Sequence, residues 1–144
     1  MKLVWHLPAR YVMALRFEFD SINKILLGRF EGRLTEELAA EFYAAIRKYS
    51  TATDASAAIW DLSSVTKFEL SSEFIRELAK REPAMPNATR RPRIIVATDT
   101  FGFGLMRMFQ MSGERTRPAL KVVYTLDEAF AELGVQSPHF EPLE

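Results

Sequence analysis

Two adjacent serines, Ser71 and Ser72, stand at the point where an amphipathic pattern begins, a position at which a hydroxyl group could do chemistry. An apolar run ends at Asp61, a polar stretch follows, and apolar residues then recur at helical spacing between Phe74 and Leu78. This pattern predicts a buried strand, a short polar loop and a surface helix that a serine hydroxyl caps. Composition and spacing alone assign that hydroxyl no further role.

A second group of small and polar residues opens a later helix. Gly102 and Gly104 follow Asp99 and Thr100, and such a strand-to-helix turn could cradle an anion. The dinucleotide fingerprint needs a third glycine where this sequence has Arg107, and no Gly-Lys-Ser or Gly-Lys-Thr of a phosphate-binding loop occurs. We therefore interpret the glycines as a tight turn.

Phenylalanine and methionine are concentrated in the helix predicted after that turn. Only one face of a helix can pack on a sheet, so these side chains provide either core packing or an apolar pocket. Helical spacing favours packing, and exposure of Met106 or Met111 would change that interpretation. The packed face is predicted to hold Phe101, Leu105, Met108 and Phe109, and the alternative pocket to be lined by Phe101, Phe103, Leu105, Met106, Met108 and Phe109.

No residues assemble into a catalytic or metal centre. Cysteine is absent, which excludes thiolate catalysis and cysteine-ligated metals. His6 and His139 lie in predicted tails, and no nucleophile elbow of the Gly-x-Ser-x-Gly type is present. The basic cluster over residues 89–93 is interpreted as a solvated loop. We predict a non-enzymatic protein with no metal and no cofactor.

The composition is that of a globular protein. Apolar residues make up 48% of the 144 residues, enough for one domain with a core. The 19 basic and 19 acidic side chains cancel, which argues against nucleic acid as a partner. The N-terminal apolar stretch is interrupted by His6 and Pro8, and no run approaches the roughly 20 apolar residues of a membrane-spanning helix. We expect a cytoplasmic protein without a membrane span.

The local patterns predict an opening hairpin followed by alternating helices and strands. An extended arm covers residues 1–10, a single domain covers 11–134, and a loosely held tail covers 135–144. The helices are predicted to begin at Thr35, Ser71 or Ser72, Asp99 or Thr100, and Thr125. Strands are predicted over residues 11–19, 24–32, 57–62, 93–98 and 120–124. This order predicts an α/β fold with about four helices on a mixed, mostly parallel sheet.

The element order resembles the STAS domain of anti-anti-sigma factors, the SpoIIAA-like fold. The resemblance is carried by residues 61–65 (Asp-Leu-Ser-Ser-Val) and 69–72 (Glu-Leu-Ser-Ser). The family motif is Asp-Leu-Ser-x-Val, three variable residues and Asp-Ser-Ser-Gly, whose second serine is phosphorylated by a partner kinase. Counting from Asp61 places that phosphoacceptor at Ser71. Residues 94–133 are similar to the uncharacterised branch described as STAS or SEC14-like domains.

The sequence departs from the motif at three positions. Glu69 replaces the aspartate, Leu70 the first serine and Ser72 the glycine, so a role for Ser71 as a helix cap alone stays open.

The resemblance implies a regulatory module that binds another protein, such as an anti-sigma-like kinase, and whether the chain also forms a homodimer is left open. The alternative function is a small-molecule or lipid carrier with an apolar pocket beside residues 102–111. The residues expected to bind the partner are Asp61, Ser63, Glu69, Ser71, Ser72, Asp99, Thr100, Gly102 and Gly104.

Overall fold

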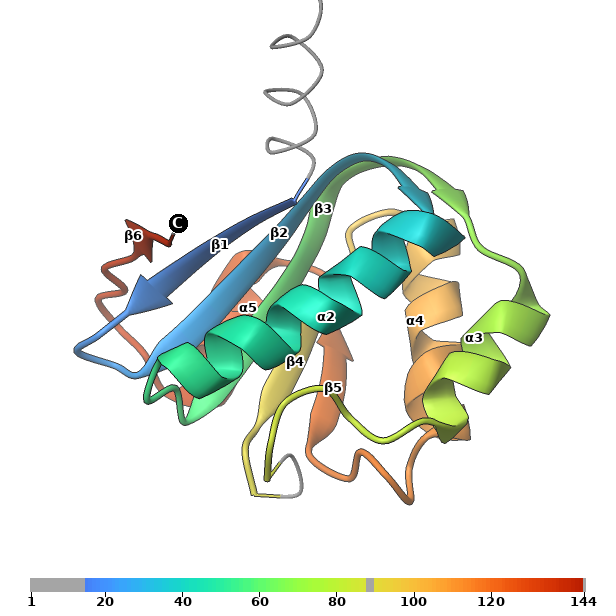
Figure 1. Cartoon of the computed structure of the whole chain (residues 1–144). Helices are drawn as coiled ribbons and strands as arrows, with labels where there is room; N and C mark the ends of the chain where they lie inside the picture. Colours follow the sequence, from blue (N-terminus) through green and yellow to red (C-terminus); the bar gives the residue numbers. More distant parts are fainter. Residues whose placement is uncertain (1–14, 88–89, 144) are drawn as a thin grey trace, which may run out of the picture.

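The computed structural model describes residues 15–87 and 90–143, in which one six-stranded sheet carries helices on both faces (Figure 1). The strand order across the sheet is β5-β4-β3-β2-β1-β6. The strands are β1 (Leu15–Asp20), β2 (Ile25–Thr35), β3 (Ala57–Glu69), β4 (Arg93–Val96), β5 (Leu120–Val123) and β6 (Glu141–Pro142). The helices are α2 (Glu36–Ala52), α3 (Ser72–Lys80), α4 (Thr100–Ser112) and α5 (Leu126–Leu133).

The sheet is mixed and mostly parallel. Strands β1 and β2 form the predicted antiparallel hairpin, and β2, β3, β4 and β5 run parallel to one another. Each parallel pair needs a crossover, which the intervening helices supply for three consecutive pairs. The predicted α/β fold with four helices on a mixed, mostly parallel sheet is confirmed, and β6 is a strand that the local patterns did not predict. The predicted arm over residues 1–10 lies outside the described residues.

The helices begin at the capping residues that the sequence patterns predicted. Thr35 Oγ1 accepts a hydrogen bond from Leu38 N at 3.1 Å, which satisfies one backbone donor of the first turn of α2. In α5, Thr125 and Glu128 form a complete capping box, and Gly134 ends the helix in a left-handed conformation with φ of 70°.

The polar stretch after Asp61 is a strand, not the predicted loop. Strand β3 continues to Glu69 and pairs with a matching continuation of β2, with two register shifts on the way. Exposed polar side chains line this part because the two strands run beyond the rest of the sheet and bend over it (Figure 1). We refer to residues 31–35 and 64–69 as the β2–β3 extension. It carries the chain from the sheet to the start of α3.

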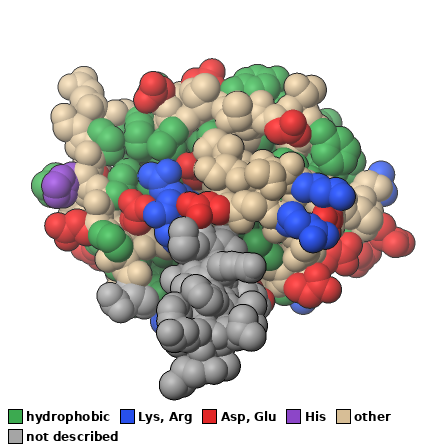
Figure 2. All heavy atoms as spheres, turned by 90° about the horizontal axis from the view of Figure 1, so that it is seen from above, with side chains coloured by type: hydrophobic (Ala, Val, Ile, Leu, Met, Phe, Trp, Pro, Cys, Tyr) green, Lys and Arg blue, Asp and Glu red, His purple; other side chains and the backbone are tan. Residues whose placement is uncertain are grey.

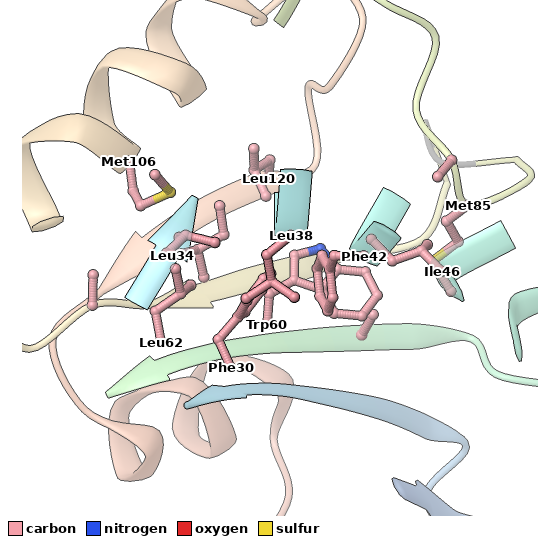
Figure 3. Packing of buried hydrophobic residues seen from close by; sticks show 14 of the residues in the cluster. Phe30, Leu34, Leu38, Phe42, Ile46, Trp60, Leu62, Met85, Met106 and Leu120 are labelled. Atoms are coloured by element: carbon pink, nitrogen blue, oxygen red, sulfur yellow. The ribbon is translucent and has the colours of Figure 1, made fainter. Parts of the chain in front are cut away.

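Two hydrophobic layers lie on opposite faces of the sheet. Helices α2, α3 and α4 cover one face and α5 covers the other (Figure 1). The strands alternate accordingly: Leu26 and Trp60 belong to the larger layer, whereas Leu27 and Ile59 belong to the smaller one. Figure 3 shows side chains of the larger layer converging from α2, α4 and the strands.

Helix α4 packs through a face that partly matches the predicted one. Leu105 is buried and Met108 and Phe109 pack against the larger layer as predicted, whereas Phe101 is 60% exposed and Gly102 and Met106 are buried as well. Met111 is 62% exposed. The face is rotated because α4 approaches β3 closely at Gly102, where a side chain would collide with Phe68.

The tail after α5 is held against the sheet, which corrects the expectation of a loose end. Asp20 is fully buried, and its carboxylate accepts hydrogen bonds from Ile22 N, Asn23 N and His139 N. Strand β6 then pairs with β1, and Phe140 packs on the layer beneath α5. One buried carboxylate therefore joins the hairpin turn to the tail.

The longest helix is α2, with 17 residues. Among the described residues, none of the helices combines the length and hydrophobicity that crossing a membrane requires.

Candidate functional site

Ser71 is an exposed N-cap at the start of α3. Its Oγ accepts a hydrogen bond from Phe74 N at 3.0 Å, and its hydroxyl lies 3.5 Å from Glu36 Oε2 in the first turn of α2. The neighbouring Ser72 is also exposed and is the first residue of the helix. The predicted capping role of Ser71 is thus confirmed, and the hydroxyl remains accessible to solvent.

One acidic side chain contacts this hydroxyl, and two others belong to the segments on either side of it in the sequence. Glu36 contacts Ser71, and Glu73 lies in the first turn of α3. Glu69 ends the β2–β3 extension, where Arg33 holds it through two hydrogen bonds of 2.7 and 2.9 Å. No local pattern indicated that the start of α2 would lie beside Ser71, because the contact joins residues 35 positions apart.

Asp61 of the predicted motif is buried. It is 3% exposed, and its carboxylate accepts hydrogen bonds from Ser63 N at 3.0 Å and from Arg29 at 3.2 Å. Arg29 in turn contacts Glu18, so this aspartate belongs to a charged network along the sheet. Ser63 is exposed, but Asp61 has no surface to offer a partner.

The start of α4 lies beside the β2–β3 extension. Asp99 caps the helix by accepting a hydrogen bond from Gly102 N at 2.9 Å, so its own carboxylate occupies the position of an incoming anion. Gly102 lies beneath Phe68, whose ring atoms would be 2.3 Å from an added Cβ. Phe68 and the exposed Phe101 meet edge to face at 6.4 Å between centroids. Thr100 and Gly104 are exposed nearby on the first turns.

The two helix starts therefore form one surface, which we call the Ser71 edge: Glu36, Phe68, Glu69, Ser71, Ser72 and residues 99–102. The top of the molecule in Figure 1, where β2 and β3 bend, is seen face-on in Figure 2, and hydrophobic, basic and acidic side chains are interspersed there. Phe68 and Glu36 were not expected on this surface, and Phe101 was predicted to pack in the core or to line an apolar pocket. A lone aromatic residue in a polar stretch was the only local signal for Phe68.

A cavity of about 100 Å³ lies inside the larger hydrophobic layer, between α2, α3, α4 and the sheet. Its walls are mostly aromatic and aliphatic, including Phe30, Trp60 and Met85, whose side chains are shown in Figure 3. Of the residues predicted for an apolar pocket, Met106 and Phe109 line this cavity, whereas Phe101, Phe103, Leu105 and Met108 do not. Phe103 instead stacks on Tyr124 with ring centroids 3.8 Å apart.

Two arginines interrupt the apolar lining of the cavity. Arg93 and Arg117 are only 3% and 4% exposed, which corrects the interpretation of residues 89–93 as entirely solvated. Burial, followed by repulsion from Arg117, lowers the pKa of Arg93 to about 10. Burial also lowers the pKa of Arg117, while the neighbouring Tyr43 acts in the opposite direction. Within the described residues, no group of acidic or histidine side chains is arranged to hold a metal ion.

The comparisons with known proteins define the fold. No protein-family model and no curated protein matches this sequence. The structure of the anti-sigma factor antagonist SpoIIAA in its unphosphorylated form has a TM-score of 0.58, with 14% identity over 86% of this chain and 100% of that one. An anti-sigma factor antagonist from Mycobacterium paratuberculosis has a TM-score of 0.57, with 19% identity over 83% and 92%.

A third similar structure is the Bacillus cell fate determinant SpoIIAA in its phosphorylated form, with a TM-score of 0.50 and 18% identity over 83% of this chain and 99% of that one. The architecture is an α/β sandwich with an opening hairpin and parallel crossovers. More particularly, the chain has the SpoIIAA-like fold of STAS domains, as the sequence resemblance implied.

Proposed function

We propose that this chain is a non-enzymatic regulatory module that binds a protein partner through the Ser71 edge. The observation that carries the proposal is the exposed hydroxyl of Ser71 on the same edge as an aromatic pair, the half-buried Phe68 and the exposed Phe101. Exposed aromatic side chains with a polar rim are typical of interface centres. The fold shared with anti-sigma factor antagonists supports a partner of the anti-sigma-like kinase class. We propose that the two proteins bind each other in the cytoplasm.

Phosphorylation of Ser71 is the proposed switch. A phosphate would add about 1.5 to 2 negative charges at the N-terminus of α3, where backbone N–H groups and the helix dipole favour an anion. The same charge would face Glu36, whose carboxylate lies 3.5 Å from the hydroxyl. The fold tolerates the group while the surface becomes strongly acidic, so an acidic partner surface is repelled.

Paired variants test the surface and the switch separately. After a partner is captured and purified, we expect Phe101→Glu to weaken its binding by about tenfold or more, because an interface aromatic is replaced by a charge. Met111→Glu, equally exposed but at the other end of α4, is the matched control and should bind normally. Equal effects of the two substitutions would place the interface elsewhere.

For the switch, we expect Ser71→Asp to weaken the same complex more than Ser72→Asp does, although both add the same charge to the Ser71 edge. Aspartate is also a good N-cap, so the midpoint of thermal unfolding should change little in either variant. Mass spectrometry after incubation with the purified kinase should locate the phosphate on Ser71. A complex that is indifferent both to Ser71→Asp and to phosphorylation would remove the switch and leave the hydroxyl as a cap.

The cavity favours ligand binding as a second candidate function. It is lined by apolar side chains with a few polar groups, which is the usual composition of a small-molecule site. Native mass spectrometry of gently purified protein should then show a bound small molecule and, at the same time, whether the chain is a homodimer, which stays a prediction. A clean apo mass with no thermal shift from added ligands would count against this candidate.

A further inference from the structure

The cavity has a polar end, formed by groups from three different parts of the chain. Arg93 begins β4, Arg117 precedes β5, and Tyr43 lies on α2, and all three line the cavity. They lie close together, because repulsion from Arg117 helps to lower the pKa of Arg93 and Tyr43 acts on both arginines. The rest of the lining is almost entirely apolar. Charge is therefore confined to one part of a hydrophobic cavity.

The positive charge of Arg117 is offset by carbonyl and hydroxyl dipoles, not by a carboxylate. Its guanidinium donates to Ala79 O at 2.8 Å, Thr116 Oγ1 at 3.2 Å and Leu78 O at 3.4 Å, and it lies 4.8 Å from the centroid of the Phe109 ring. No acidic side chain of the described residues forms an ion pair with it. The carbonyl groups at the end of α3 offset part of its charge. Burying a cation with such partners alone is costly, and a bound anion would relieve that cost.

Tyr43 provides a second polar group. Its hydroxyl oxygen is buried and makes no well-aligned hydrogen bond to any described residue, although it lies close enough to Arg117 to act against the lowering of the pKa of that guanidinium. A buried hydroxyl without a well-aligned partner is unfavourable, and the mutual repulsion of two buried guanidinium groups adds to this cost. A ligand oxygen placed at this end would meet a hydrogen-bond donor and two positive charges together. These groups suit a small anion.

The volume of the cavity also limits the size of the apolar group that a bound anion can carry. Its volume of about 100 Å³ is smaller than the roughly 150 Å³ of an apolar cavity that binds benzene. A short alkyl chain therefore fits the walls as they stand, and a single ring is the upper limit, which requires the flexible side chains of Met85 and Met106 to move. A carboxylate is a planar monoanion that matches the guanidinium fork, whereas a phosphate dianion loses more solvation on entering apolar surroundings.

We propose that this cavity binds a small apolar carboxylate, with Arg117 and Tyr43 holding the carboxylate and the side chains of α2, α4 and the sheet enclosing the apolar group. The proposal rests on the second candidate function and names its ligand class. It is independent of the Ser71 edge.

The methionines offer a direct test of where a ligand binds. Met85 and Met106 line the cavity, whereas Met111 is 62% exposed on the surface of α4. With methyl-labelled methionine, titration of the full chain with benzoate should shift the NMR signals of Met85 and Met106 and leave Met111 unchanged. Benzamide, the neutral analogue of the same size, should bind about tenfold more weakly or not at all. Equal binding of benzoate and benzamide would overturn the anion assignment and leave ligand binding as a function intact.

Substitutions on one helix separate the cavity from the surface. Ala39 lines the cavity and Ala44 is exposed, both on α2. Ala39→Leu fills part of the space and should weaken benzoate binding about tenfold, while Ala44→Leu should leave it unchanged. Absence of benzoate and benzamide binding to the unmodified chain would overturn both this proposal and the second candidate function.

The polar end is tested by two further variants. Arg117→Met should remove the preference for benzoate over benzamide. Because that residue also supports the end of α3, Tyr43→Phe is the safer variant, and we expect a loss of affinity for benzoate of about three- to tenfold with folding retained. Unchanged benzoate affinity in Tyr43→Phe, or an unchanged preference in Arg117→Met, would overturn the assigned polar end.

Discussion

The two hydrophobic layers of this protein differ in how completely they are filled. Beneath α5, Ile25, Leu27 and Ile59 are at most 2% exposed, and the C-terminal tail closes the layer with Phe140. Beneath α2, α3 and α4, the layer is larger but contains a cavity and two arginines. A layer that serves stability alone has no need of space or buried charge. The α5 layer is therefore the more completely packed of the two, and the other layer contains the space in which we propose that a ligand binds.

The largest expected effect compares one leucine from each layer. Leu27 is completely buried beneath α5, whereas Leu62 borders the cavity. We expect Leu27→Ala to lower the free energy of unfolding by about 4 kcal/mol and Leu62→Ala by about 2 kcal/mol, because a side chain beside empty space has fewer contacts to lose. Urea denaturation measures both. Equal losses would show that the two layers are equally well packed.

The closure of the α5 layer by the tail depends on Asp20. Burial raises the pKa of this carboxyl, but hydrogen bonds from Asn23, His139 and Ile22 outweigh it and hold the pKa below the ordinary 3.8. The stabilisation is therefore present above the unfolded pKa and is lost as the pH falls through the folded pKa. We expect Asp20→Asn to cost about 2 kcal/mol at pH 7 and progressively less below pH 4. A difference that does not depend on pH would mean that the carboxylate charge is unimportant.

Two glycines of α4 allow a packed position to be compared with an open one. A Cβ at Gly102 would collide with Phe68, whereas a Cβ at Gly104 meets nothing within 4 Å. We expect Gly102→Ala to destabilise by about 1–2 kcal/mol, and Gly104→Ala to stabilise by up to about 1 kcal/mol through helix propensity. Thermal unfolding of both variants measures this contrast, and a harmless Gly102→Ala would show that Phe68 moves aside freely.

The smallest expected effect is a gain in stability, in contrast to the losses expected for the leucine and aspartate variants. Removing the buried hydroxyl in Tyr43→Phe should leave the free energy of unfolding unchanged or raise it by less than about 1 kcal/mol. Calorimetry of the unliganded protein would check this. A clear loss of stability would indicate that the hydroxyl is already satisfied, which would weaken the case for a ligand at that end of the cavity.

The features that the sequence predicted well are local ones. The caps at Thr35, Ser71, Asp99 and Thr125 involve hydrogen bonds to backbone groups three residues away, so spacing alone reveals them. The alternation of strands and helices was likewise enough to predict the mixed, mostly parallel sheet. The position of Ser71 at a helix start followed from the same local signal.

The features that were missed depend on partners far away in the chain. In the β2–β3 extension, the polar residues 64–69 pair with residues 31–35, more than 30 positions earlier in the chain. Without that partner in view, residues 64–69 have the pattern of a loop. The tail is held by Asp20, 119 residues before His139. The polar end of the cavity joins Tyr43, Arg93 and Arg117, each of which is unremarkable within its own segment. Nothing in a local pattern reports that such residues meet.

The attachment of the tail also determines how the sheet ends. Leu143 N donates to Phe17 O at 2.8 Å, and Pro142 pairs with Glu18 on the outer side of β1. An uncovered edge strand is a template for pairing with other chains and for aggregation. Proline has no N–H to offer a further strand, and the exposed Glu141 beside it adds a repelling charge. Residues 141–143 thus protect the edge of the sheet from pairing with other chains. Removing them would leave β1 as an uncovered edge strand.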